Sequence, residues 1–275
     1  MSTKIQVAII TPYKVASEFA YRKLQLLLPK TLLHSQEYCD LFSSANRGPD
    51  QLVILDNGAA EGEIKETTEL LQAASLIEPD VIVAPDDLFS GSNTKAMTHK
   101  FLKSDDFLRY CDTHGRPEIM VVPHGNSLSQ WKTSLLDLLE YSPSWIGIAK
   151  IHSTLSPTGC ITGRLDLVRI VNSLDLVGIR IHLLGLDLPP TELMIISEKA
   201  SAKHTISVDT AMPWAFAQQG LTMNIGYGFL KRPSDLHSDE DWNPTREEVN
   251  IAKWNILVIE GMAGGVSESA AYANR

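Results

Sequence analysis

Short hydrophobic runs recur along the chain, and longer segments that mix hydrophobic and polar residues separate them. The runs have the length of a strand and lack a regular polar alternation, which predicts strands buried on both faces, as in a parallel sheet. We expect seven such strands, at IQVAII (5–10), LVIL (52–55), VIVA (81–84), IMVV (119–122), WIGIA (145–149), IRIHLL (179–184) and TISV (205–208). An eighth strand is expected at LTMNI (221–225).

The segments between these strands show the spacing of amphipathic helices, with hydrophobic residues three or four positions apart. The clearest are EIKETTELLQAASLI (63–77), SLSQWKTSLLDLLEY (127–141) and RLDLVRIVNSLDL (164–176). Strands that alternate with helices predict an α/β fold, either an open doubly wound sheet or a closed barrel. The chain has 275 residues. The strand count alone does not decide between these two architectures. We predict the (β/α)8 TIM-type barrel, which routinely takes about 250 residues as one domain.

The pattern changes near the C-terminus. We predict that residues 1–228 form the catalytic barrel domain, and that residues 229–275 form a loop and a helix packed on the barrel. The helix should begin at an N-cap Asn243, with Pro244 in its first turn, and end near Gly261. A hydrophobic stripe supplies its docking face: Val249, Ala252, Ile256 and Ile259.

The composition of the chain indicates where in the cell the protein works and whether its cysteines form disulfides or bind metal. No hydrophobic run approaches the roughly 20 residues that span a bilayer, and the first residues lack the cleavage site of a secretory signal. We therefore expect a cytoplasmic protein without membrane contact. The cysteines, Cys39, Cys111 and Cys160, are too far apart to suggest a disulfide framework or a metal-binding knuckle. We expect reduced thiols, and neither a metal nor another cofactor.

The net charge of −9 argues against broad electrostatic attachment to nucleic acid, which needs many Lys and Arg contacts to phosphate. A local basic face is still compatible with it. Lys95, His99 and Lys103 are spaced i, i+4, i+8 and would share one side of a helix, although such charges can also be simply solvated. The acidic chain also leaves room for a basic protein partner or a homodimer.

Chemically active side chains follow five of the expected strands. Asp56, Asp86, His124, Lys150 and Asp209 each come at or just after the end of a hydrophobic run. Because the carboxyl ends of parallel strands open on one mouth of a barrel, these side chains should converge there. A single Asp after a strand is often only the N-cap of the next helix, and a His beside Gly often lies in a turn. Repetition at successive strand ends favours an active site.

Six short stretches at or near these strand ends form an ordered set of motifs within residues 52–213. They are LDNGAA (55–60), PDDL (85–88), PHGN (123–126), IGIA (146–149), HLLGLDLPPTEL (182–193) and VDTAMP (208–213). In this order they resemble the T-D-S-G-G-F, F-D-E-C, V-Q-G-G, I-G-G-L-A, L-M-G-V-G-x-P-x-x-L and F-D-C-V-[ML]-P motifs of the tRNA-guanine transglycosylase superfamily. The chain is most similar to the shorter phage and bacterial members, which insert 7-deazaguanines into DNA.

The chain departs from the family's pattern within three motifs and in one missing segment. His124 stands where the family has Gln, Gly58-Ala59-Ala60 replaces Gly-Gly-Phe, and no arginine follows Met212-Pro213. The Cys-x-Cys-x-x-Cys run of the zinc subdomain, which the tRNA enzymes carry, has no counterpart in this sequence. DNA is therefore the expected polymer rather than tRNA.

The resemblance implies an exchange of guanine for a free 7-deazaguanine base in DNA or RNA, through a covalent glycosyl-aspartate. Asp209 would be the nucleophile and Asp56 the general acid and base. Asp86 would accept hydrogen bonds from N1 and the amino group of guanine. The carbonyl edge and the 7-substituent would be held by His124 and by the backbone near Gly147 and Ile148, and Lys150 would touch phosphate or balance the acids. The target base would be flipped out of a duplex, or taken from a single strand.

Two other readings of the same residues stay open. Asp56, Asp86, His124 and Asp209 could ligate Mg²⁺ or Mn²⁺ in a metal-dependent hydrolase, or serve a nucleosidase. The barrel could also be a non-catalytic subunit that binds nucleic acid, because one fold hosts many functions.

Overall fold

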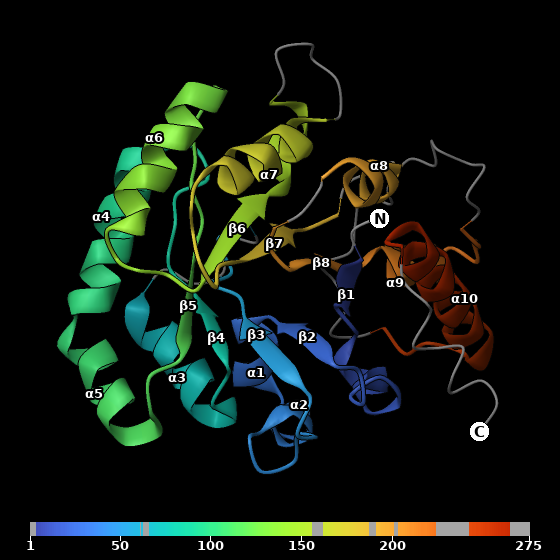
Figure 1. Cartoon of the computed structure of the whole chain (residues 1–275). Coiled ribbons are helices and arrows are strands. Elements are labelled where there is room, and N and C mark those ends of the chain that lie inside the picture. Colours follow the sequence, from blue (N-terminus) through green and yellow to red (C-terminus); the bar gives the residue numbers. More distant parts are fainter. Residues whose placement is uncertain are drawn as a thin grey trace.

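The structure is a computed structural model, and it describes residues 4–60, 62, 66–155, 162–186, 191–200, 203–223 and 242–264. Eight parallel strands form one sheet that curves into a nearly closed barrel and alternates with helices (Figure 1). The predicted (β/α)8 TIM-type fold is confirmed. The strands are β1 (Ile5–Ile9), β2 (Leu24–Leu27), β3 (Leu52–Leu55), β4 (Val81–Val83), β5 (Glu118–Val121), β6 (Trp145–Ala149), β7 (Arg180–Leu184) and β8 (Ile206–Thr210).

The strands follow one another around the barrel in the order β1-β8-β7-β6-β5-β4-β3-β2. Neighbours in this order are joined by parallel hydrogen-bonded ladders, and β1 and β2 are the two ends of the sheet. Because all strands run the same way, their carboxyl ends face one side of the barrel.

The eighth strand of the barrel is β2, and the prediction of a strand at residues 221–225 is wrong. Leu221–Met223 are not in a strand, and residues 224–225 lie outside the described part of the chain. β2 has only four residues, with Gln25 among them. The side chain of Gln25 is buried and donates hydrogen bonds to the carbonyl oxygens of Phe19 and Arg22. A polar residue that is buried because the backbone just before the strand satisfies it interrupts the hydrophobic run, and the short strand is then not recognised from the pattern.

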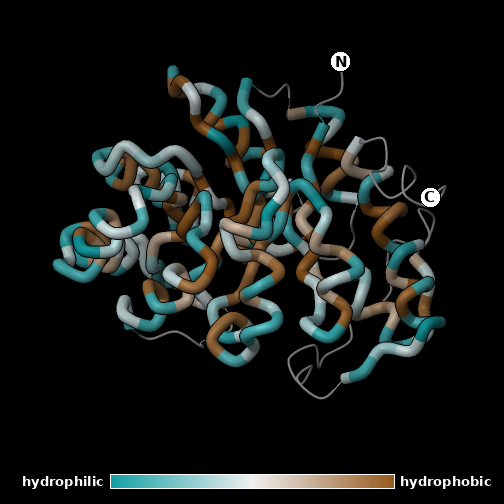
Figure 2. The backbone as a smooth tube through the Cα atoms, turned by 90° about the horizontal axis from the view of Figure 1, so that it is seen from below, coloured by the Kyte–Doolittle hydropathy of each residue, from teal (hydrophilic) through white to brown (hydrophobic). Residues whose placement is uncertain are grey.

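Helices cover the outside of the barrel. They are η1 (Tyr13–Glu18), α1 (Pro29–His34), α2 (Gln36–Phe42), α3 (Thr67–Ile77), α4 (Gly91–Lys103), α5 (Asp105–His114), α6 (Leu128–Leu139), η2 (Lys150–Thr154), α7 (Gly163–Ser173), α8 (Thr191–Lys199), α9 (Met212–Ala217) and α10 (Arg246–Met262), where η marks a 3-10 helix. The helices predicted from residue spacing correspond to α3, α6 and α7, although residues 63–65 lie outside the described part. Hydrophobic and hydrophilic stretches alternate along the helices, as expected of one inward face (Figure 2).

Serine residues mark where several helices begin. The hydroxyl oxygens of Ser35, Ser90, Ser104 and Ser127 each accept a hydrogen bond from the backbone N–H three residues later, at the start of α2, α4, α5 and α6. Each serine satisfies an N–H group that the helix itself cannot pair, an interaction that contributes typically about 1 kcal/mol.

Alternate residues of each strand face opposite sides of the sheet, which separates an inner core from the outer ones. The inner core fills the barrel with Ala8, Leu24, Leu26, Ile54, Val81, Val83, Met120, Val122, Trp145 and Ala149. Two outer clusters join the strands to the helices, one around β1, β6, β7 and β8 and one around β2 to β5. The interior is therefore a packed core rather than a pore, and ligand chemistry belongs at its mouth.

The last helix, α10, packs on the barrel as predicted, and Val249, Ala252, Ile256 and Ile259 are all buried in the outer cluster of β1 and β8. Its predicted start is wrong. The N-cap is Thr245, which forms a capping box with Glu248. A Ser or Thr three residues before a Glu is a stronger start signal than the Asn243–Pro244 pair. None of the described helices combines the length and the apolar character needed to cross a membrane.

Candidate active site at the mouth of the barrel

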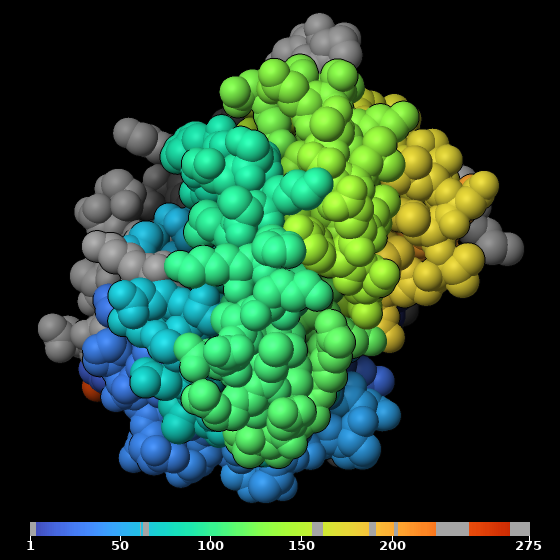
Figure 3. Space-filling model, turned by 90° about the vertical axis from the view of Figure 1, so that its left-hand side faces the viewer, coloured from blue at the N-terminus to red at the C-terminus, as the bar shows by residue number. Residues whose placement is uncertain are grey.

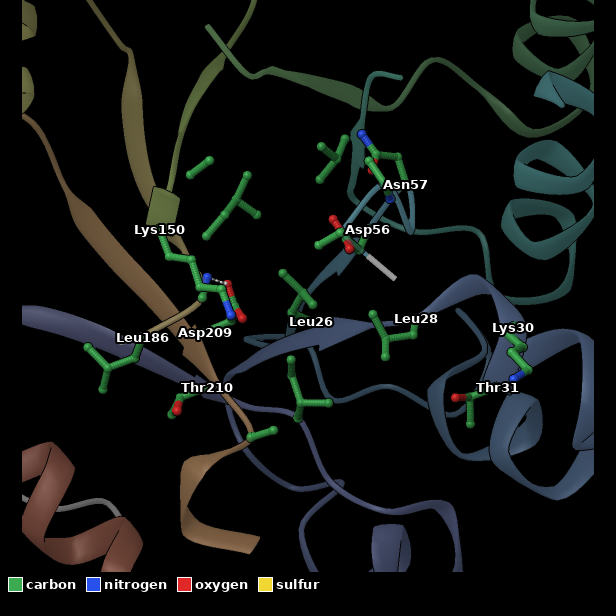
Figure 4. A pocket seen from close by; sticks show the side chains of 18 of the residues that line it. Leu26, Leu28, Lys30, Thr31, Asp56, Asn57, Lys150, Leu186, Asp209 and Thr210 are labelled. Atoms are coloured by element: carbon green, nitrogen blue, oxygen red, sulfur yellow. Dashed lines mark hydrogen bonds between the residues drawn. The ribbon is translucent and has the colours of Figure 1, made fainter. Parts of the chain in front are cut away.

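A cavity of about 650 Å³ opens at the carboxyl ends of the strands, and Asp56, Asp86, Lys150 and Asp209 all line it. Lys150 and Asp209 lie on one side, Asp56 and Asn57 lie on the other, and Leu26 lies between them (Figure 4). The volume falls in the range of small-molecule sites, about 300–1,000 Å³. Much of the remaining wall is hydrophobic: Ile10, Val83, Val122, Leu184, Leu186, Met212 and Trp214.

Asp209 lies within β8, one residue before its end, rather than after the strand as the sequence suggested. The residue is 4% exposed, and Oδ1 accepts two hydrogen bonds, from the backbone N–H of Gly185 at 2.8 Å and from Nε2 of His182 at 3.1 Å. Oδ2 receives no hydrogen bond from the part of the chain that the structure describes. One oxygen is thus fixed by two N–H donors, and the other is not used by the described protein groups.

The N–H of Gly185 is held in place by a buried arginine. Nη1 of Arg164, on α7, donates to the carbonyl oxygens of Leu184 at 3.3 Å and Gly185 at 2.6 Å. Nε and Nη2 of the same side chain bind the carboxylate of Glu192 on α8. We call Arg164, Glu192 and Gly185 the β7 clamp. It fixes the turn that follows β7, and with it one of the two donors to Asp209.

Gly185 is needed at this turn for its backbone and for its lack of a side chain. Its φ angle is 68°, in the left-handed region that L residues avoid. A Cβ atom there would lie 3.1 Å from Cδ of Lys150. Lys150, the first residue of η2, therefore packs its aliphatic stem on the same turn that binds Asp209.

The second donor to Asp209, His182, is completely buried inside the barrel. Its Nδ1 lies 2.7 Å from Oγ of Ser207, and that hydroxyl also reaches the carbonyl oxygen of Ile181. The order Asp, His, Ser is that of a hydrolase triad. Ser207 is 0% exposed, however, so its hydroxyl cannot meet a substrate. The series orients His182 and does not supply a nucleophile.

Asp86 meets the cavity with both oxygens already hydrogen bonded. Nδ2 of Asn57 donates to Oδ1 at 2.6 Å, and Nε2 of His124 lies 2.5 Å from Oδ2. The Asn57 amide is fixed in turn, because Nδ2 also donates to the carbonyl oxygen of Ala84 and Oδ1 accepts from the N–H of Ala59. Each carboxylate oxygen still has a second lone pair for a ligand.

His124 stands behind Asp86 and is not part of the cavity lining. Its Nδ1 lies 3.2 Å from Nε2 of a second buried histidine, His152 on η2. Burial lowers the pKa of His152 to about 4, and the neighbouring His124 acts in the same direction, whereas a hydrogen bond to the backbone of Pro123 raises it. His152 is therefore neutral at pH 7.

Asp56 follows β3 directly and is only partly buried, so it reaches the cavity more openly than the other two carboxylates. Gly147 and Ile148 are not brought to the cavity. A Cβ on Gly147 would point into the barrel core, toward Leu184, Val122 and Met120, and the side chain of Ile148 is buried in the outer cluster. Their predicted contact with a base stays a prediction.

Two of the three basic residues that share one side of α4, Lys95 and His99, contact other side chains of the protein. Nζ of Lys95 binds Asp137 at 3.2 Å and Glu140 at 3.3 Å, and Nδ1 of His99 lies 3.2 Å from the hydroxyl of Tyr141. These partners lie on α6 or just after it, and α4 packs against α6 along this side of the molecule (Figure 3). Of these basic residues, Lys95 is therefore paired with acids of the protein itself.

Two further predictions concern metal and thiols. Within the described residues, no three His, Cys, Asp or Glu side chains are grouped so that they could hold one metal ion. Cys39 and Cys111 are free thiols, and burial raises the pKa of both. Cys160 lies outside the described residues.

Three functional residues escaped the sequence analysis, namely His152, Arg164 and His182. His182 carries a signal in hindsight, since a histidine inside an otherwise hydrophobic strand must be buried and must find a partner. Arg164 begins a helix and resembles an ordinary surface charge, and nothing in the sequence marks it.

Comparison of the chain with models of known protein families gives no match, and comparison with curated protein sequences gives none either.

Proposed function

We propose that the protein is a transglycosylase that exchanges guanine for a 7-deazaguanine derivative in DNA. The observation that carries the proposal is how the carboxylate of Asp209 is hydrogen bonded and where it lies. Its Oδ1 is fixed by His182 and Gly185, and it lines the same cavity as a second, more open carboxyl group, Asp56. A nucleophile and a separate acid facing one cavity are what a two-step displacement at C1′ of a nucleotide requires.

In the first step, Oδ2 of Asp209 forms a bond to C1′ of the sugar, and the bond between C1′ and the guanine nitrogen breaks. The electron pair of that bond goes to the departing base, which takes a proton from Asp56. In the second step, the carboxylate of Asp56 removes a proton from the ring nitrogen of the incoming 7-deazaguanine. That nitrogen attacks C1′ and releases Asp209. Electrons and protons balance, and no further reactant is needed.

Two observations favour this chemistry over other reactions that the same fold supports: the sequence motifs and the position of Asp86. The motifs that resemble the transglycosylase superfamily contain both Asp56 and Asp209, at the ends of β3 and β8. Asp86 adds a carboxylate at the end of β4 that can accept hydrogen bonds from N1–H and the amino group, which guanine and its 7-deaza analogues share. DNA is preferred over tRNA because the sequence has no cysteine run for the zinc subdomain of the tRNA enzymes.

The test measures incorporation of a labelled base. The protein is incubated with DNA and radiolabelled guanine or a 7-deazaguanine, and label is counted in the polymer, with tRNA as the parallel substrate. We expect label in DNA from the wild-type protein and none from Asp209→Asn. Asp56→Asn should lower the rate by about a hundred- to ten-thousand-fold, the usual loss for a general acid or base.

Other outcomes would contradict the proposal. Release of guanine without incorporation of label would identify a nucleosidase. Activity that requires added Mg²⁺ or Mn²⁺ and is lost on chelation would identify a metal-dependent hydrolase. DNA binding without either reaction would identify a non-catalytic subunit.

A further inference from the structure

One peptide group lies between a buried cation and the carboxylate of Asp209. It is the group that joins Leu184, the last residue of β7, to Gly185. Its N–H donates to Oδ1 of Asp209 at 2.8 Å, and its carbonyl oxygen accepts from Nη1 of Arg164 at 3.3 Å. The same Nη1 donates to the next carbonyl oxygen along the chain, that of Gly185, at 2.6 Å. Because the C=O and N–H of a trans peptide point in opposite directions, Arg164 and Asp209 hold this peptide from its two sides.

This peptide has two possible orientations, and both partners select the same one. Gly185 has a φ of 68°, and glycine takes positive and negative φ with similar ease. Turning the peptide plane over would point the carbonyl oxygen of Leu184 at the carboxylate of Asp209, and the N–H at the guanidinium of Arg164. Two acceptors would then meet on one side and two donors on the other. The guanidinium therefore favours the orientation that gives Asp209 its N–H donor.

Arg164 can hold the peptide because its own position is fixed. The side chain is completely buried and always charged, and its Nε and Nη2 bind the carboxylate of Glu192 on α8. The residue before it, Gly163, begins α7 against η2, where a Cβ atom would overlap the carbonyl oxygen of His152. The backbone that carries Arg164 therefore has no room to move toward η2.

Stability alone does not account for this buried ion pair. Two hydrophobic side chains of similar volume often stabilise a protein as well as a buried Arg–Glu pair, or better, because no charge has to be removed from water. Hydrophobic side chains cannot donate to the carbonyl oxygen of Leu184. A cation on that oxygen also polarises the peptide, which makes the N–H of Gly185 a stronger donor to Asp209. The contact of Arg164 thus has an effect at Asp209 that a hydrophobic pair would not supply.

We propose that Arg164 is a positioning residue that acts on Asp209 through the Leu184–Gly185 peptide, by keeping its N–H turned toward Oδ1. In the proposed reaction this N–H holds the carboxylate while Oδ2 attacks C1′. It also stabilises the charge that returns to Asp209 when the incoming base displaces it. These kinetic consequences rest on the proposed function, whereas the orientation of the peptide does not.

The first experiment observes the N–H of Gly185 itself by NMR. Leu184–Gly185 is the only Leu–Gly pair in the sequence, so isotope labelling of leucine carbonyl carbons and glycine nitrogens identifies its amide signal. The amide proton should exchange slowly with deuterated water, and its signal should move upfield in Asp209→Asn, where the charged acceptor is lost. Arg164→Lys should give the same upfield shift and faster exchange, because lysine lacks the planar fork that binds Glu192 and the carbonyl oxygens together. Arg169→Met, which removes an exposed arginine of the same helix, should leave the signal unchanged.

The second experiment separates positioning from folding. Arg164→Met is combined with Glu192→Met, so that no buried carboxylate is left without its partner and urea titration should show a stability close to that of the wild-type protein. The rate at which saturating DNA forms its adduct with Asp209 should still fall about ten- to a hundredfold, as expected when a hydrogen bond to a charged group is lost. The affinity for DNA should not change, because neither side chain lines the cavity. If the double variant does not fold, Arg164→Lys, which keeps a charge opposite Glu192, takes its place in the rate measurement.

The outcomes are distinguishable. A stable double variant that forms the adduct at the wild-type rate would mean that Arg164 serves folding alone, and it would overturn the inference. An unchanged Gly185 signal in Arg164→Lys would overturn it as well, whatever the protein catalyses. If the wild-type protein forms no adduct with DNA, the proposed function is refuted, and the NMR result decides the inference by itself.

Discussion

Asp86 and Asp209 enter the cavity from strands four positions apart in the sheet order, and each has a buried histidine behind it. They differ in which of their carboxylate oxygens already receive hydrogen bonds from the protein. Both oxygens of Asp86 are hydrogen bonded to protein groups, and the histidine beside it, His124, contacts a second histidine, His152. The two hydrogen bonds to Asp209 both end on Oδ1, and the histidine that donates one of them, His182, is hydrogen bonded to Ser207. A carboxylate bonded at both oxygens is suited to recognition, and one whose second oxygen receives no hydrogen bond from the described residues is suited to attack.

The largest effect should come from replacing the two carboxylates in the same way. Asp209→Asn removes the attacking oxygen and should reduce exchange by about 10⁴-fold or more, with loss of any DNA–protein adduct that survives denaturation. Asp86→Asn leaves the nucleophile intact and should weaken base binding about ten- to a hundredfold while the adduct still forms. A trapped adduct that maps to Asp86 or Asp56 rather than to residues 205–213 would reverse the assignment.

The β7 clamp gives the next largest effect, and it should be confined to the Asp209 side. Arg164→Met leaves the carboxylate of Glu192 buried and without its arginine, which should cost about 3–5 kcal/mol of unfolding free energy in urea titration. Adding Glu192→Gln should recover part of that loss. Arg169→Met on the exposed face of the same helix should change stability by about 0.5 kcal/mol or less.

Acid should act on the Asp86 side instead. The pKa of His152 is about 4 in the folded protein and about 6.5 when unfolded, so the unfolded chain binds the proton first as the pH falls. Its contribution to stability is complete above about pH 6.5 and is lost toward pH 4, by about 3 kcal/mol. Urea titrations at pH 7.5 and 4.5 should show a steeper loss for the wild-type protein than for His152→Gln. Parallel losses in the two proteins would contradict the assignment.

The smallest effects test the donors behind Asp209. His182→Phe keeps the ring volume but removes the hydrogen bond to Oδ1, and exchange should fall about ten- to a hundredfold. Ser207→Ala removes only the support of His182 and should cost about twofold to tenfold. If Ser207→Ala reduced exchange as much as Asp209→Asn does, the serine would take part in the reaction. The proposed difference between the Asp86–His124 pair and the Asp209–His182 pair would then be wrong.

The sequence predicts the strands and most of the charged residues that line the cavity. It does not predict the buried groups that form hydrogen bonds to Asp86 and Asp209. Continuous hydrophobic runs identify seven strands, and the residues that follow them include Asp56, Asp86 and Lys150, which line the cavity. The hydrophobic pattern predicts that β8 ends before Asp209, because a charged residue is typical of a loop. The hydrogen bonds from Gly185 and His182 that allow a carboxylate inside the strand come from β7 and the turn after it.

The histidines show the same limit. His124 could be predicted near the site from its place after β5, but its contact with Asp86 rather than with the cavity depends on side-chain direction. His152 lies in η2 and meets His124 only because β5 and β6 are neighbours in the barrel. Local patterns reveal which residues end a strand. They do not reveal which of those residues pair across strands, because pairing is set by three-dimensional register.

The contacts of α10 with the first strand and with Arg22 affect the order in which the molecule folds during synthesis. The N–H of Ile5 in β1 is bound by the carbonyl oxygen of Ala263, and buried Arg22 pairs with Glu260 of α10, 238 residues further along the chain. At a synthesis rate of about 5–20 residues per second, the first strand waits roughly 12–50 s for this partner to emerge. Until then Arg22 has no carboxylate from α10, and the hydrophobic face of β1 is uncovered. The contacts of α10 with Ile5 and Arg22 therefore form late in synthesis, and a circular permutant that joins α10 directly to β1 should shorten that interval.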